Sequence, residues 1–170
     1  DGGWNLTDNI VCQKKFIHQR GSLNLLDIIL TCHQGYDSQG IETRSILLNH
    51  SRLAIYGGMI ITDNLTLSAD NSTITIYGAD IGSRIQGTNS VSFNNLTFSN
   101  TNTSCSNIIN INYIEFNTTI SAHKLILDNG YVYLSGMGST YPVLSCDSLI
   151  MTGPCGKRIN QWMTLQVESM

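Results

Sequence analysis

Residues 93–100 read FNNLTFSN, a stretch in which apolar and polar residues alternate. Leu96 and Phe98 take every second position, and Asn95 and Thr97 take the positions between them. Because successive side chains of a β-strand point to opposite faces, this alternation predicts a strand with one buried and one exposed face. Asn95 also begins an Asn-Leu-Thr triplet, the acceptor pattern for N-linked glycan, and the alternation places it on the exposed face.

The same alternation of apolar and polar residues around a leucine recurs along the chain, which indicates an imperfect repeat. The tripeptide IYG at 55–57 recurs at 76–78. Coils of about 20 to 30 residues, each with two or three short strands, are typical of a solenoid, in which a strand pairs in parallel with its equivalent in the next coil. The leucines that we expect to be equivalent, spaced by 31, 29 and 24 residues, are Leu65, Leu96, Leu125 and Leu149.

From residue 44 to 170 the chain is a succession of short apolar or alternating runs separated by Gly, Asn, Asp and Ser, with almost no helical periodicity. Only two prolines interrupt it, as strands paired on both edges require. We therefore expect an all-β chain. A β-sandwich, which also has short strands at regular spacing, is the alternative architecture.

The pattern of short apolar runs and turn residues in residues 44–170, and FNNLTFSN in particular, resembles the right-handed parallel β-helix (pectin-lyase-like) superfamily of secreted and surface proteins. The resemblance implies a right-handed solenoid. Residues 1–43 differ, because they hold two cysteines, two of the four lysines and the denser apolar stretch SLNLLDIILTC. We expect this segment to cap the first coil, with LNLLDIIL open to either a short helix or a strand.

The composition favours an extracellular protein. Only 12% of residues are charged, against a norm of about 25%, while Asn, Ser and Thr together supply 51 residues. The net charge of -3 comes with no basic run, which argues against a nucleic-acid partner. No apolar stretch approaches the roughly 18 residues of a membrane helix, so we expect no membrane span.

The chain contains seven Asn-x-Ser/Thr triplets, where random order of the same composition gives about 3.4. Accidental triplets in an Asn-rich and Thr-rich chain are the competing explanation. The excess predicts covalent N-linked glycans and a secreted location. The expected glycosylation sites are Asn5, Asn49, Asn64, Asn71, Asn95, Asn102 and Asn117.

Five cysteines suit an oxidising compartment if four of them pair. Their spacing proposes one disulfide between Cys12 and Cys32 and another between Cys146 and Cys155. Cys105 is left over. Three roles stay open for it: burial as a free thiol, exchange for one of those partners, or a bond to a neighbouring chain.

The sequence contains no recognisable pattern of catalytic or metal-binding residues, and it implies no cofactor. Polysaccharide cleavage needs paired carboxylates, or a base with a cation, on one face. The acids instead stand one at a time among Asn, Ser or Gly, where a turn role is expected; they are Asp63, Asp70, Asp80, Asp128 and Asp147. The histidines lack zinc-site spacing; they are His18, His33, His50 and His123.

Four tyrosines in the expected strands have two interpretations, an exposed ladder that stacks on sugars and ordinary cross-strand packing, and we favour packing. They are Tyr56, Tyr77, Tyr131 and Tyr133.

These features together predict a non-enzymatic structural or adhesive protein. A solenoid has two different ends, so head-to-tail contact between copies would generate a filament, with surface carbohydrate as a further expected partner. The alternative is a β-helix protein that binds or cleaves polysaccharide.

Overall fold

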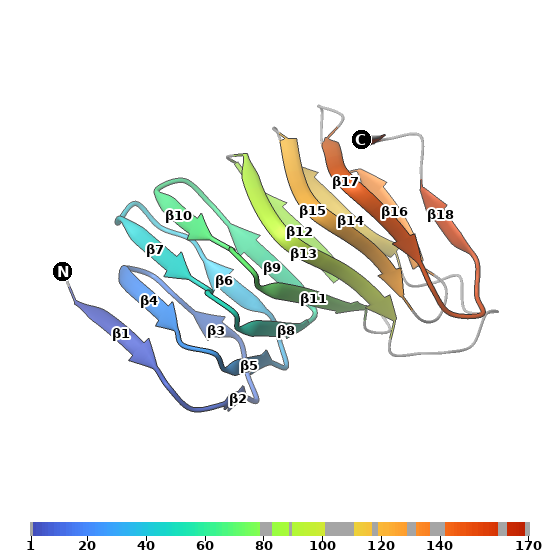
Figure 1. Cartoon of the computed structure of the whole chain (residues 1–170). Helices are drawn as coiled ribbons and strands as arrows, with labels where there is room; N and C mark the ends of the chain where they lie inside the picture. Colours follow the sequence, from blue (N-terminus) through green and yellow to red (C-terminus); the bar gives the residue numbers. More distant parts are fainter. Residues whose placement is uncertain are drawn as a thin grey trace.

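The computed structural model describes residues 2–78, 83–88, 90–100, 111–116, 119–128, 132–136, 142–159 and 163–168. These residues form an all-β solenoid in which neighbouring strands of all three sheets pair in parallel. Figure 1 shows the coils stacked from the N-terminal strands to the C-terminal ones. The predicted parallel β-helix is confirmed. Among the described residues, no helix is long and apolar enough to cross a membrane.

Three sheets run along the solenoid. Sheet A consists of β1 (Gly3–Leu6), β4 (Gly21–Leu25), β7 (Arg44–Leu47) and β10 (Leu65–Ser68). Sheet B consists of β2 (Ile10–Cys12), β5 (Ile29–Cys32), β8 (Arg52–Tyr56), β11 (Thr73–Gly78), β13 (Val91–Asn100), β15 (Thr119–Asp128), β17 (Val143–Met151) and β19 (Thr164–Val167). Sheet C consists of β3 (Phe16–Ile17), β6 (Tyr36–Ser38), β9 (Gly58–Ile61), β12 (Ser83–Gly87), β14 (Ile111–Phe116), β16 (Val132–Gly136) and β18 (Lys157–Ile159).

The interior is built from columns of equivalent apolar residues. One column in sheet B follows the register of six successive strands and consists of Leu30, Leu53, Ile74, Leu96, Leu125 and Leu149. The first five are at most 2% exposed. Stacking of this kind removes a continuous apolar surface from water, and it is the main source of stability in a solenoid.

The predicted repeat is largely confirmed. Leu96, Leu125 and Leu149 share one register position, and the two IYG copies pair, Ile55 with Ile76 and Tyr56 with Tyr77. Leu65 is the exception. It lies in sheet A opposite Arg44, and the true equivalent of Leu96 in the preceding coil is Ile74.

Residues 1–43, which were expected to cap the first coil, contribute strands to the solenoid itself in the part of this segment that the structure describes. β1 to β3 form the first coil and β4 to β6 the second, and each of these strands joins one of the three sheets. The segment LNLLDIIL contributes to β4 and β5, so the strand alternative holds over the helix. Its period was obscured because Leu23, Leu25, Ile28 and Leu30 all point inward around a turn at Asp27, whose φ is +55°.

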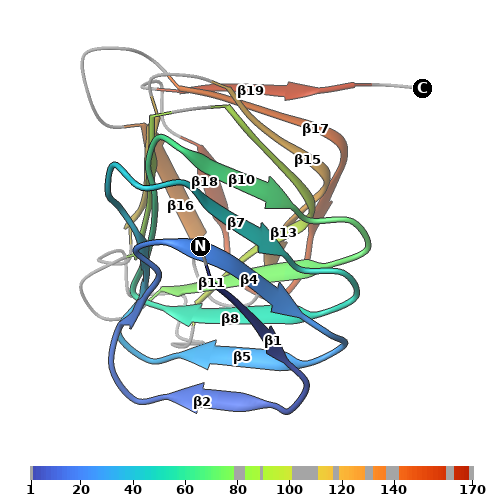
Figure 2. The same ribbon diagram turned by 90° about the vertical axis from the view of Figure 1, so that its left-hand side faces the viewer.

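Sheets A and B merge in the later coils. β13, β15 and β17 are nine or ten residues long and curve round one edge of the solenoid (Figure 2). Two successive side chains escape burial at each bend, Asn94 with Asn95 in β13 and His123 with Lys124 in β15. The apolar-polar-apolar segments VSF (91–93) and LTF (96–98) therefore belong to one bent strand, because a corner of two residues breaks the alternation of the side chains without breaking the hydrogen-bonded ladder.

Candidate functional site

Three of the predicted acceptor asparagines lie in tight turns. Asn49, Asn64 and Asn71 have φ values of +47°, +63° and +54°. Asparagine is one of the few side chains that adopts this left-handed region readily. The turn geometry therefore favours asparagine at these positions whether or not they are glycosylated. Asn64 and Asn71 are exposed, and Asn49 is half-buried.

Asn5, Asn24 and Asn49 form a hydrogen-bonded ladder across the first three coils. The Asn24 amide nitrogen donates to Asn5 Oδ1 at 3.1 Å, and Asn49 Nδ2 donates to Asn24 Oδ1 at 2.8 Å and to the Leu25 carbonyl at 2.7 Å. Asn5 is exposed, and the ladder uses its oxygen. An N-linked sugar at Asn5 leaves this ladder bond in place, whereas one at Asn49 displaces a donor hydrogen.

The remaining acceptors are less exposed or not described. Asn95 is half-buried on the outer face of β13, opposite Thr73 and Lys124. Leu96 and Phe98 beside it are fully buried, as the alternation predicted, but Thr97 is only 8% exposed. Asn102 and Asn117 lie outside the described residues.

Cys12, Cys32 and Cys146 carry free thiols in this structure. Cys12 and Cys32 are nonetheless register partners on β2 and β5. Burial, followed by the proximity of Cys12, raises the pKa of the Cys32 thiol to about 12. Cys155 is disulfide-bonded, and because Cys146 is free, the predicted Cys146–Cys155 pair is wrong. Cys105 lies outside the described residues.

Two of the predicted isolated acids bridge coils. Asp63 accepts a hydrogen bond from Thr88, and Asp128 accepts one from Thr152 at 2.5 Å. Asp80 lies outside the described residues. Asp70 and Asp147 behave differently, because they line one groove together with Glu168. Asp70 accepts a hydrogen bond from Ser68 beside its own turn, as expected of an isolated acid, and it shares the groove with Asp147 because the bend of the long strands brings separate coils to one surface.

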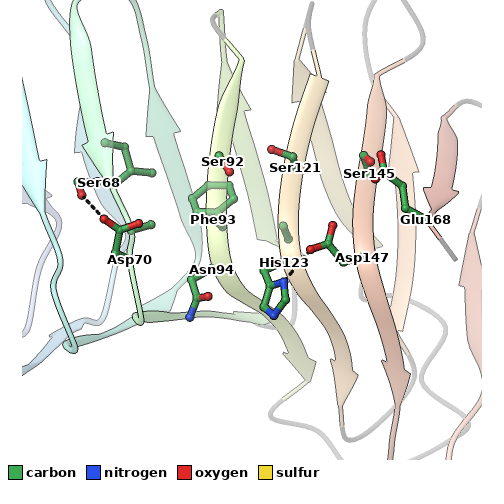
Figure 3. Close-up of a pocket in the computed structure, with 13 residues that line it drawn as sticks. Ser68, Asp70, Ser92, Phe93, Asn94, Ser121, His123, Ser145, Asp147 and Glu168 are labelled. Atoms are coloured by element: carbon green, nitrogen blue, oxygen red, sulfur yellow. Dashed lines mark hydrogen bonds and ion pairs between the residues drawn. The ribbon is translucent and has the colours of Figure 1, made fainter. Parts of the chain in front are cut away.

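This corner groove has a volume of about 460 Å³ and crosses β13, β15 and β17 between the end of β10 and the residue after β19. Figure 3 shows its side chains in rows across the strands. One row is a serine row, Ser92, Ser121 and Ser145, which share one register position. Phe93, 2% exposed, packs into the interior between the polar rows.

A histidine–carboxylate pair occupies the second row of the corner groove. His123 Nδ1 lies 2.7 Å from Asp147 Oδ2, and both side chains are about half exposed. This pair was not predicted from the sequence, although the repeat contains a signal for it. Superposing the repeats on Leu125 and Leu149 places His123 over Asp147, which are two residues before each leucine.

The first coil leaves its apolar interior uncovered. β1, β2 and β3 each end their sheet. Trp4 shares the inward register position of Leu23, yet Trp4 is 56% exposed and Leu23 only 1%. Trp4, Leu6, Ile10 and Phe16 help to line a cavity of about 270 Å³ at this end. We call this surface the open end.

The described tyrosines pack on one another. The Tyr56 ring lies 4.5 Å from Tyr77 and 5.1 Å from the His33 ring, centroid to centroid, and each pair is nearly parallel. Each face of the Tyr56 ring is therefore covered by a neighbour, which agrees with cross-strand packing. Tyr131 and the side chain of Tyr133 lie outside the described residues. His18 is 2% exposed and His50 pairs with Asp27.

Comparisons with known proteins found no match: no protein-family model matches the chain, and neither the curated proteins nor the solved structures contain a significant match.

Proposed function

We propose that the protein is a secreted, N-glycosylated structural or adhesive solenoid that associates head-to-tail with further copies of itself. The observation that carries the proposal is the open end, where the inward-facing Trp4 is 56% exposed. An uncovered apolar interior beside unpaired strand edges favours another strand layer in that place.

A second copy would supply strands that can pair with the edge strands of the open end. Sheet B runs from β2 to β19, and sheet C runs from β3 to β18. A copy whose β2 lies beside β19, with its β3 beside β18, continues both ladders in the register that the coils already use. Because the two contacting surfaces differ, the contact does not close and generates a filament.

The glycan part of the proposal rests on Asn5, Asn64 and Asn71, which are exposed on the sides of the solenoid. Sugar on the sides discourages lateral aggregation of the sheets and leaves the two ends free. The measurement is the intact mass of the natural material before and after enzymatic removal of N-linked glycan. An unchanged mass contradicts this part of the proposal.

The assembly part is tested by light scattering over a concentration series. We expect the mass to rise with concentration, and we expect Trp4→Asp to hold the protein as a monomer. Ile41→Asp is the matched control, because Ile41 is 88% exposed but lies in the β6–β7 connection. A wild-type monomer at all accessible concentrations contradicts the assembly.

A mixing experiment tests the head-to-tail geometry. Trp4→Asp blocks one end, and Val167→Lys on the edge strand β19 blocks the other, since Val167 is 50% exposed there. Each variant alone stays monomeric, and an equimolar mixture forms dimers that do not grow. Longer species in the mixture are the contrary result.

The corner groove favours a second candidate function, the binding of a polysaccharide along the solenoid axis. Hydroxyl, amide and carboxylate groups that converge in one open groove are the usual means of holding sugar hydroxyls. The measurement is calorimetric titration with soluble oligosaccharides, and the absence of heat with all of them contradicts this candidate.

A further inference from the structure

The corner groove repeats its chemistry once per coil. The serine row places Ser92, Ser121 and Ser145 at one register position of three adjacent strands. A second row consists of Asn94, His123 and Asp147, two residues further along the same strands. Neighbouring parallel strands lie about 4.8 Å apart, so each kind of group recurs at that interval along the solenoid axis.

The interval selects the kind of polymer that fits. A chain of pyranose units extended along the axis advances by about the coil spacing per ring, and in a β-1,4-linked chain every second ring turns the same hydroxyls towards the groove. An extended peptide advances about 3.3 Å per residue and falls out of step with the rows within a few residues. The repeat therefore favours a glycan chain over a peptide strand.

The charge of the corner groove selects the class of glycan. Three carboxylates line it, Asp70, Asp147 and Glu168, and its described lining includes no lysine or arginine. Asp70 accepts a hydrogen bond from Ser68 at 3.3 Å. Among β13, β15 and β17, the one lysine or arginine is Lys124, the second residue of the bend in β15, which lies opposite Asn95 and Ser148. A uronic-acid chain is repelled by this lining, and an ammonium group is attracted.

The pair His123–Asp147 contributes in a second way. The Asp147 carboxylate pairs with Nδ1 of His123, so Nε2 is the ring nitrogen that a ligand in the groove can contact. Figure 3 shows the ring between Asn94 and Asp147. A neutral imidazole held in this way offers Nε2 as an acceptor to a sugar hydroxyl or an amine, with Asp147 fixing the ring orientation.

We propose that the corner groove binds an amine-bearing glycan, an oligomer of an amino sugar, with its hydroxyls on the serine row and its ammonium groups beside Asp70, Asp147 and Glu168. This inference rests on the polysaccharide-binding candidate function and names its ligand class.

The test is calorimetric titration of the wild-type protein with four probes: a β-1,4-linked glucosamine hexamer, its fully N-acetylated counterpart, an oligogalacturonate, and hexalysine. We expect the glucosamine hexamer to bind and the oligogalacturonate to give no heat. Added salt weakens an attraction of this kind. Equal affinity for the N-acetylated hexamer overturns the amine proposal but keeps polysaccharide binding, and no heat from any glycan overturns both. Equal affinity for hexalysine shows charge attraction alone and also overturns the proposal.

Matched variants locate the site. The double variant Asp147→Asn/Glu168→Gln is expected to lower the affinity for the glucosamine hexamer by about tenfold or more. Asp27→Asn is the control, because it removes the carboxylate of another exposed histidine pair, with His50 at 3.3 Å, and asparagine keeps the positive φ of that position. An equal loss in Asp27→Asn, or no loss in the double variant, overturns the placement.

Discussion

At the scale of single residues, asparagine serves two structural purposes that the triplet count does not separate. Asn49, Asn64 and Asn71 hold left-handed turns, and Asn5 and Asn24 belong to the amide ladder. The hydrogen-bonding role of each amide nitrogen then decides what a glycan would disturb there. A sugar replaces one hydrogen of Nδ2, so an amide that donates twice loses a bond.

We expect glycan occupancy to differ between Asn5 and Asn49. Asn5 is exposed and uses its oxygen in the ladder, whereas Asn49 donates both hydrogens, at 2.8 and 2.7 Å. Site mapping by mass spectrometry after enzymatic deglycosylation should find Asn5 modified and Asn49 bare. Full occupancy of Asn49 is the opposite result.

His18 makes stability depend on pH. Its side chain is 2% exposed, with Nδ1 3.0 Å from the Tyr36 hydroxyl and Nε2 3.0 Å from the Gly21 carbonyl oxygen. Burial, and to a smaller extent Arg44, lowers the pKa of His18, against the raising effect of the backbone bonds. The unfolded chain then binds more protons, so this contribution is complete above about pH 6.5 and declines as the pH falls from there towards the folded pKa.

The measurement is the free energy of unfolding in denaturant between pH 7.5 and 5, taken in steps of about half a unit. We expect wild-type stability to fall with pH and His18→Gln to flatten the dependence. His50→Gln is the control, since its side chain is 70% exposed. A wild-type slope that survives in His18→Gln shows that another group is responsible.

At the scale of the strands, each long strand works as two short ones joined at a corner. β13 buries Leu96 and Phe98 in sheet B after the bend and Val91 and Phe93 before it. One strand thus anchors two faces of the interior, and its side chains contact two apolar columns. Loss of a large side chain here leaves a cavity that neighbouring coils, fixed by their own ladders, fill only in part.

Phe98→Ala is expected to lower the free energy of unfolding by about 3–5 kcal/mol. Phe98 is 0% exposed and lies between Ile76 and Leu127 in the register. Ser92→Ala on the exposed face of the same strand should stay within about 0.5 kcal/mol. Denaturant melts of both variants give the comparison, and equal losses contradict the assigned interior.

At the scale of the whole molecule, the solenoid has unequal protection along its axis. Each coil contacts only its neighbours, so a terminal coil has one stacking partner instead of two. The first coil lacks a stacking partner on one side, and it also leaves large apolar side chains in water, with Val11 58% and Ile17 59% exposed. Opening therefore costs least at β1 to β3 and most in the middle coils.

Hydrogen–deuterium exchange tests this gradient. In the Trp4→Asp monomer, amides of β2 should exchange faster than those of β8, which is paired on both sides by β5 and β11. In the wild-type protein, protection of β2 should increase with concentration, because a stacked copy supplies the missing neighbour. Protection of β2 that does not depend on concentration contradicts the head-to-tail contact.

The sequence alone determined the fold class and much of the register. Alternation at Leu96 and Phe98 needs only neighbouring residues, and the repeats of Leu125 and Leu149 report a period that stacking enforces. The strands within residues 1–43 were not predicted from the sequence, because turn residues at Asp27 obscure the alternation there. The sequence also misplaced Leu65, since three sheets per coil offer three similar positions for an apolar repeat.

The corner groove and the open end could not be predicted from the sequence, because both depend on which coils lie beside one another. His123 and Asp147 are 24 residues apart, and they meet because two bent strands lie in one ladder at the same register. The exposure of Trp4 likewise follows from its place in the first coil, since the equivalent Leu23 in the second coil is buried. A local pattern specifies the face on which a side chain lies, whereas its partners and its burial depend on which coils are stacked beside it.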